Sequence, residues 1–86
     1  MTDNNIESTI RTIFCEVFGV SESEVRDDTA YDSFEAWDSL RHLEFVARFE
    51  DEFDIDIEID DVIAMETFKK VKDTVKKYIS QKAVAA

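Results

Sequence analysis

Apolar residues recur at intervals of three and four along the first 18 residues of the chain. This spacing places them on one face of a helix, which we predict over residues 4–18. Gly19 follows at the position where helices commonly end in a left-handed residue. A second apolar stripe predicts a helix over residues 68–79, with Thr67 as its cap and lysines toward its C-terminal half, where the helix dipole favours cations. We expect residues 81–86 to fray.

The helix predicted over residues 39–53 is the most informative one, because its apolar arc is unusually wide. Either Asp38 or Ser39 caps its start. On a helical wheel its apolar side chains span roughly 220°, whereas an ordinary surface helix needs a stripe of ~100°. Three phenylalanines form one margin as core, and the other margin consists of Leu40, Leu43 and Ala47. Either this second margin contacts another molecule or the helix is simply central in its bundle, and periodicity favours neither reading.

The segment between these helices, residues 19–38, has little periodicity and is predicted to be a long loop. Ser21 and Glu24 have the spacing of a capping box, which predicts one short turn within it. Apolar residues scattered through the loop are expected to anchor it against the core; they are Val25, Tyr31, Phe34 and Trp37.

Three isoleucines, Ile55, Ile57 and Ile59, alternate with acidic residues in a pattern typical of a strand. A single strand would have no partner, so its backbone groups would stay unpaired. We therefore predict an extended connector whose isoleucines pack into the core of the bundle, followed by a short helix over residues 60–65. The chain is accordingly predicted to be all-α: a four-helix bundle with three long helices and one short one, forming a single domain over residues 1–86.

Composition narrows the possible partners. The chain has no proline and one glycine, which favours helices, and 86 residues leave little room for a deep catalytic cleft. Its net charge of −11 repels phosphate backbones and anionic lipids, so we expect neither a nucleic-acid nor a membrane partner, and self-repulsion favours a monomer. The sequence shows no signal pattern or membrane span, and Cys15 alone cannot form an internal disulfide, which is compatible with the cytoplasm.

Two other chemistries fit the sequence poorly. A calcium loop that began at Asp54 would place Ile59 where glycine is required and Met65 where the bidentate glutamate belongs, so we predict no metal site. Cys15 and His42 could be imagined as a nucleophile and its base. Cys15 lies among core positions of a helix, however, and is better explained as a buried structural cysteine, with His42 as a packed or partly exposed histidine.

Ser39 begins the predicted central helix, where unpaired N–H groups and the positive end of the dipole stabilise an attached phosphate. Serine is also a common cap that carries nothing. The residues around Ser39 favour an attached phosphate over an unmodified cap. The segment from Trp37 to Phe45, which contains Asp38-Ser39-Leu40, and its continuation through an acidic stretch to Phe53, Ile55 and Ile57 resemble the phosphopantetheine-attachment region of acyl carrier proteins. The length, the acidity and the order of helices are also similar to that family over nearly the whole chain.

The resemblance implies a covalent 4'-phosphopantetheine arm on Ser39, with Asp38 helping to engage the metal-dependent transferase that installs it. It implies a carrier without catalysis of its own, whose partners are that phosphopantetheinyl transferase, a ligase or transferase that loads an acyl or aminoacyl group, and downstream pathway enzymes. The surface that these partners read would include five residues: Leu40, Arg41, Glu44, Val46 and Arg48.

The sequence departs from the family pattern in two respects. Ala36 and Trp37 stand where a glycine often precedes the serine, and Trp-Asp-Ser-Leu is more typical of carriers from discrete, specialised pathways. Arg41 and Arg48 put positive charge on a helix that is mostly acidic in fatty-acid carriers. The cargo, whether a fatty acyl chain, a polyketide intermediate, an amino acid or a small hydroxy acid, stays open. The alternative function is an acidic helical interaction module that binds a partner through the apolar margin of residues 39–53 and is never modified.

Overall fold

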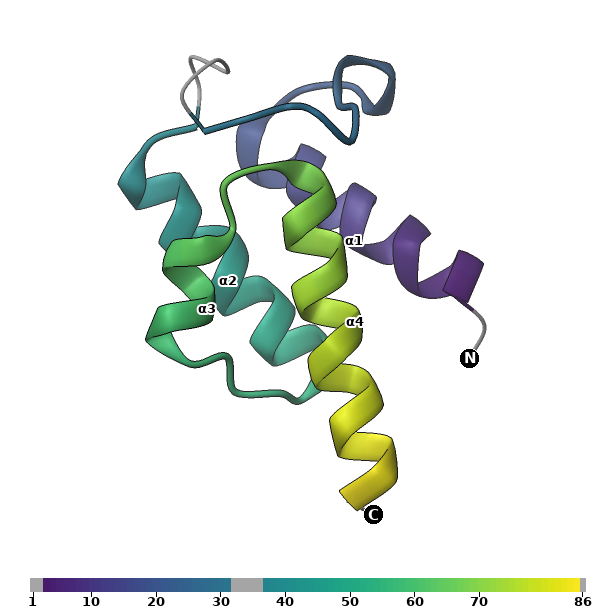
Figure 1. The fold of residues 1–86 in the computed structure, drawn as a ribbon. Coiled ribbons are helices and arrows are strands. Elements are labelled where there is room, and N and C mark those ends of the chain that lie inside the picture. Colours follow the sequence, from purple (N-terminus) through teal and green to yellow (C-terminus); the bar gives the residue numbers. More distant parts are fainter. Residues whose placement is uncertain (1–2, 32–36, 86) are drawn as a thin grey trace.

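The structure, a computed structural model, describes residues 3–31 and 37–85. Its helices are α1 (Asp3–Phe18), the 3-10 helix η1 (Glu22–Glu24), α2 (Ser39–Phe53), α3 (Ile59–Ala64) and α4 (Phe68–Ala85). Figure 1 shows the short helix α3 beside α2, with α4 crossing next to them and the loop from α1 to α2 running along one end of the bundle. The predicted all-α class, with three long helices and one short helix, is confirmed.

Helix α4 runs to Ala85, past the predicted end at residue 79 and into the segment expected to fray. Lys82 explains part of this extension, because its ammonium group lies 3.0 Å from the backbone oxygen of Asp54 and 2.9 Å from that residue's carboxylate. The last turns of α4 are thereby attached to the end of α2. Helix α3 begins at Ile59, one residue before the predicted start.

Aromatic side chains from three helices meet in the core. Phe14 of α1 packs against Phe45 of α2 and Phe68 of α4, with ring centroids 5.4 Å and 4.9 Å apart, and all three are fully buried. Cys15 is buried as expected, and burial raises the pKa of its thiol. This cysteine is therefore neutral and inaccessible, which suits packing rather than nucleophilic chemistry.

The connector between α2 and α3 behaves as predicted at two of its three isoleucines. Ile55 and Ile57 are each 8% exposed and belong to the core, whereas Ile59 is 65% exposed because it already begins α3. Glu50 holds the connector in place by accepting a hydrogen bond from the backbone N–H of Ile57 at 2.9 Å.

The loop between α1 and α2 is anchored at both of its ends. Val25 and Trp37 are buried as predicted, whereas Tyr31 is 44% exposed, and Phe34 lies outside the described residues. The predicted capping box forms: the backbone N–H of Ser21 donates to the Glu24 carboxylate at 2.8 Å. Two buried anchors thus fix this loop, whose described residues form one short helix, η1.

The same loop satisfies the first backbone groups of α4. The N–H groups of Phe68 and Lys69 donate to the backbone oxygens of Thr29 and Asp27, at 2.9 Å and 3.0 Å. The hydroxyl of Thr67 accepts from the backbone N–H of Lys70 at 3.2 Å, as expected of a cap. Helix α4 therefore starts where the loop supplies hydrogen-bond partners.

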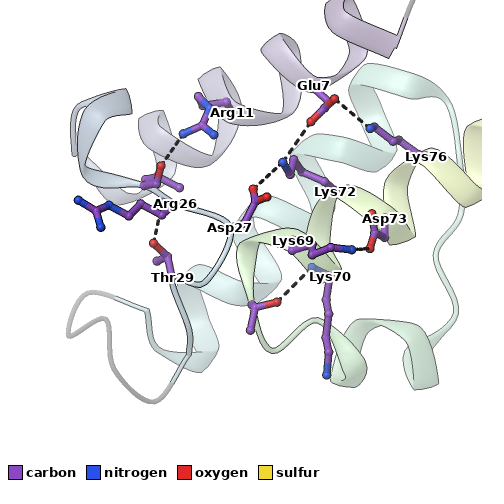
Figure 2. Close-up of polar contacts among 12 residues, drawn as sticks. Glu7, Arg11, Arg26, Asp27, Thr29, Lys69, Lys70, Lys72, Asp73 and Lys76 are labelled. Atoms are coloured by element: carbon purple, nitrogen blue, oxygen red, sulfur yellow. Dashed lines mark hydrogen bonds and ion pairs between the residues drawn. The ribbon is translucent and has the colours of Figure 1, made fainter.

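Lys72 joins three segments that lie far apart in the sequence. Its ammonium group lies 3.1 Å from the carboxylate of Glu7 in α1 and 2.7 Å from that of Asp27 in the loop (Figure 2). Lys76 adds a second contact to Glu7 at 3.1 Å. Hydrogen bonds from Lys72 and Lys76 lower the pKa of Glu7, and the bond from Lys72 lowers the pKa of Asp27. Both carboxylates are thereby held in the charged form.

Candidate functional site

Ser39 is the first residue of α2, and its side chain is exposed. Of the two predicted caps, Asp38 is the one that acts: its carboxylate accepts a hydrogen bond from the backbone N–H of Arg41 at 2.9 Å. The helix start therefore does not depend on the Ser39 hydroxyl. This hydroxyl stands on the surface, where a visiting enzyme can reach it.

The N-terminus of α2 suits an attached phosphate. The helix has 15 residues, so its peptide dipoles leave a positive end at Ser39. Backbone N–H groups of the first turn point out of the helix, and an anion placed there accepts hydrogen bonds from them. An exposed hydroxyl at this position fits a phosphodiester-linked prosthetic group on both steric and electrostatic grounds.

A groove of about 420 Å³ opens directly beside Ser39, between α2 and α3. Ser39 is one of its lining residues, and most of the others are apolar. Met65 and Val62 are buried, while Ile59 and Ile63 at its edge are 65% and 69% exposed. The remaining lining residues are Tyr31, His42, Leu43 and Glu66. An arm attached to Ser39 would thus begin next to an apolar surface.

The two isoleucines of α3 were not recognised in the sequence as site residues. The alternation of Ile55, Ile57 and Ile59 grouped Ile59 with two core residues, and Ile63 stands alone in a short helix. Only the placement of α3 against α2 shows that Ile59 and Ile63 face outward at the groove. Their apolar side chains in an acidic helix are the one signal that could have marked them.

The predicted apolar margin of α2 is exposed at Leu40 and Leu43, by 67% and 56%. Val46, also predicted to lie on the partner surface, is only 6% exposed and belongs to the core. That prediction is wrong for a geometric reason: at ~100° per residue, Val46 lies about 60° from the buried Phe49 but about 120° from Leu40. It shares the core side of the helix.

Arg41 and Arg48 both reach from α2 to the end of α1. The guanidinium of Arg41 donates to the backbone oxygen of Val17 at 2.6 Å, and that of Arg48 donates to the Glu16 carboxylate at 2.7 Å. Arg41 also lies 4.0 Å from Glu44. Their side chains stay about half exposed, 46% and 50%. The two arginines therefore connect α2 to the end of α1, and their charges remain accessible at the surface.

Two carboxylates of the acidic stretch after α2 have ion-pair or hydrogen-bond partners. Asp54 pairs with Lys82, and Asp61 contacts Tyr78 and Lys77. Over residues 3–31 and 37–85, the structure contains no group of three or more side chains arranged to hold a metal ion. In the same part of the chain no helix is long and apolar enough to cross a membrane.

Comparison with known proteins places the chain in a family. The family described as "Phosphopantetheine attachment site" matches residues 8–75. An acyl carrier protein from Karelsulcia muelleri is 34% identical over 79 residues, covering 92% of this chain and 95% of its own. One from Akkermansia muciniphila is 37% identical over 57 residues, covering 66% and 71%.

A solved structure supports the fold independently. The solution NMR structure of a holo acyl carrier protein from Geobacter metallireducens superposes with a TM-score of 0.80, at 21% identity and with 93% and 92% of the two chains covered. The helical bundle, the exposed serine at a helix start and the adjoining groove define a carrier domain. The chain belongs to the acyl carrier protein family, whose members are carriers rather than catalysts and bear covalently attached 4'-phosphopantetheine.

Proposed function

We propose that Ser39 carries the 4'-phosphopantetheine arm and that the protein shuttles an acyl, aminoacyl or polyketide intermediate between pathway enzymes. One observation supports this assignment above the others. The exposed Ser39 hydroxyl stands at the positive end of α2, with Asp38 rather than Ser39 acting as the cap, and it borders the apolar groove. Attachment at Ser39 leaves the helix start intact.

Installation of the arm requires little of this chain beyond presenting a hydroxyl. The Ser39 oxygen attacks the phosphorus atom of coenzyme A that bears the pantetheine group. A new oxygen–phosphorus bond forms, and the bond from that phosphorus to the nucleotide leaving group breaks. The transferase accepts the hydroxyl proton. Asp38, whose carboxylate is exposed next to Ser39, helps to engage the metal ion of that transferase. When bound, the arm supplies a thiol on which cargo is held as a thioester.

The surface around Ser39 is proposed to be the one that partners read. Leu40 supplies an exposed apolar contact, and Glu44, Arg41 and Arg48 supply charges of both signs. Ile59 extends this surface onto α3. An apolar centre with a charged rim suits brief docking, because complementary charge speeds association while a small contact area permits release.

The finer assignments follow from the same proposal. The phosphopantetheinyl transferase, a loading ligase or acyltransferase, and downstream enzymes are the proposed partners, and the protein acts as a cytoplasmic monomer. Trp37 before Asp38 favours a discrete carrier of a specialised pathway over a housekeeping fatty-acid carrier. Arg41 and Arg48 support this reading, because they alter the charge that a fatty-acid enzyme would meet on α2.

Intact-mass measurement tests the attachment site. The protein is incubated with coenzyme A, magnesium and a broad-specificity phosphopantetheinyl transferase. We expect one added phosphopantetheinyl group, located at Ser39 by peptide fragmentation, and none in Ser39→Ala. Ser80→Ala, which removes another exposed serine from α4, is the matched control and should be modified like the unaltered protein.

An unmodified interaction module predicts a different result. In that case several transferases would leave the mass unchanged although circular dichroism shows a folded helical protein. Modification of Ser39→Ala, or of a different serine, would overturn the assignment of Ser39 while leaving membership of the family intact.

A further inference from the structure

The side chain of His42 lies between the groove beside Ser39 and part of the aromatic core. The imidazole lines the groove. It also packs against Phe45 and stacks on Trp37, with ring centroids 4.8 Å and 5.9 Å away. Phe45 and Trp37 are 0% and 2% exposed, so the core begins directly behind the His42 ring.

Both nitrogens of this ring are held by hydrogen bonds. Trp37 Nε1 lies 2.9 Å from His42 Nδ1, and His42 Nε2 lies 2.7 Å from the backbone oxygen of Val62. An indole N–H can only donate, so Nδ1 is the acceptor and the proton resides on Nε2, which donates to Val62. The two hydrogen bonds therefore fix the tautomer and the orientation of the ring.

These two hydrogen bonds connect three segments of the chain. Trp37 belongs to the segment before α2, His42 to α2 and Val62 to α3. A group that moved from the groove toward the core between α2 and α3 would have to displace the ring. Displacement would break both bonds and leave the Trp37 N–H, in a residue 2% exposed, without its acceptor.

We propose that His42 is a specificity-determining crossbar that closes the inner end of the groove and limits it to short acyl groups. This inference rests on the proposed attachment of the arm at Ser39. The groove has a volume of about 420 Å³, and its buried lining residues next to His42 are Val62 and Met65. A short apolar group lies against Leu43, Ile59 and Ile63, whereas the far end of a long chain stays in solvent.

The packing behind the crossbar supports this limit. Phe45 and Met65 are fully buried, and a close-packed core has no space ready for additional methylene groups. A long chain would therefore have to open the core as well as break the two hydrogen bonds of His42. The first carbons of an acyl chain enter the groove because this removes apolar surface from water. Beyond the length of the groove, the buried apolar area no longer increases with chain length.

Carriers loaded with acyl groups of graded length test the crossbar. The transferase is supplied with acetyl-, hexanoyl- and dodecanoyl-coenzyme A, and intact mass confirms each product at Ser39. The melting temperature should rise from acetyl to hexanoyl and change little from hexanoyl to dodecanoyl. In His42→Ala it should continue to rise, by roughly 4 °C or more between hexanoyl and dodecanoyl.

Leu43→Ala is the matched control, because it truncates another lining residue at the exposed edge of the groove and leaves the crossbar in place. It should lose part of the hexanoyl gain without acquiring a dodecanoyl gain. A continued rise in the unaltered protein, or the same plateau in His42→Ala, would overturn the proposal.

A second measurement uses the unaltered protein, so the test does not depend on whether the His42→Ala variant folds. The indole N–H of Trp37 gives an NMR signal that reports directly on its bond to His42. This signal should keep its position with all three acyl groups, and a shift that grows with chain length would show that the ring is displaced. Absence of any adduct at Ser39 is a separate result, because it contradicts the proposed function before chain length is compared.

Discussion

The carboxylate of Asp38 accepts a hydrogen bond from the backbone N–H of Arg41 at 2.9 Å, and this contact fixes the start of α2. The neighbouring Ser39 is therefore not needed to cap the helix. Asp38 thus has two separable properties: an oxygen that caps the helix and a negative charge beside the proposed attachment site.

Two substitutions of Asp38 should separate these properties. Asp38→Ala removes the cap and should lower the free energy of unfolding by about 1 kcal/mol in urea titrations. Asp38→Asn keeps a capping oxygen and should unfold within a few tenths of a kcal/mol of the unaltered protein. If the charge engages the transferase metal, both variants should be modified at Ser39 more slowly. Normal modification of Asp38→Asn would limit Asp38 to capping.

The sequence predicted the helices well because their signal is local. Three-and-four spacing determined which face of each long helix is apolar. Residue type predicted Thr67 as a cap and left Asp38 and Ser39 as alternatives, between which the structure selects Asp38. Burial of Ile55 and Ile57 was predicted by rejecting an unpaired strand. The extension of α4 to Ala85 was missed because Lys82 contacts the distant Asp54 across the bundle.

The site was harder to predict, because a surface depends on what the other helices cover. Leu40 and Val46 both belong to the wide apolar arc of α2, yet one is exposed and the other buried. The bonds from His42 to Trp37 and to Val62 join residues 5 and 20 positions away in sequence. Periodicity carries no information about such contacts, and only the placement of α3 reveals them.

Lys72 should make stability depend on pH. Its hydrogen bonds lower the pKa of Glu7 and Asp27 in the folded state below their ordinary values of 4.5 and 3.8. The resulting stabilisation is fully present above those ordinary values and is lost as the pH falls through the lowered pKa values of the folded state. In Lys72→Met, which keeps most of the apolar stem, the free energy of unfolding should fall by roughly 1 kcal/mol at neutral pH, since the exposed carboxylates weaken the pairs.

The comparison needs two pH values, because acid also neutralises the repulsion among the other carboxylates of this strongly acidic chain. The difference between the unaltered protein and Lys72→Met should therefore be measured in urea near neutral pH and again near pH 3, where it should be smaller. Lys69→Met, which breaks an exposed pair with Asp73 within α4, is the control and should cost less than Lys72→Met. An equal loss at both pH values would show that Lys72 acts through packing instead.

Asp54 ends α2 in the left-handed region, with a φ of 54°. A side chain there is strained, and a negative charge at a helix C-terminus opposes the dipole. Its ion pair with Lys82 compensates little, because the Asp54 side chain is 93% exposed. Asp54→Gly should therefore raise the free energy of unfolding by about 0.5–1 kcal/mol, and Asp54→Ala should not raise it. Thermal and urea unfolding of the three proteins would reveal this order, and a less stable glycine variant would contradict it.

Tyr78 should control how firmly α3 is held against the bundle. Its hydroxyl donates to the Asp61 carboxylate at 2.5 Å and accepts from the backbone N–H of Glu58 at 3.1 Å. The bond to Asp61 raises the pKa of Tyr78 and lowers the pKa of Asp61. Tyr78→Phe removes both contacts and leaves the ring in place.

Because α3 is only six residues long, it opens locally when these contacts are lost. Amide hydrogen exchange in α3 of Tyr78→Phe should be about five- to tenfold faster, while exchange at Phe14 and Phe45 in the core should change little. Tyr31→Phe removes a phenolic hydroxyl from an exposed loop residue and should leave exchange in α3 unchanged. Faster exchange throughout the molecule would mean that Tyr78 supports global stability rather than the position of α3. Unaltered exchange in α3 would mean that its apolar contacts alone keep it in place.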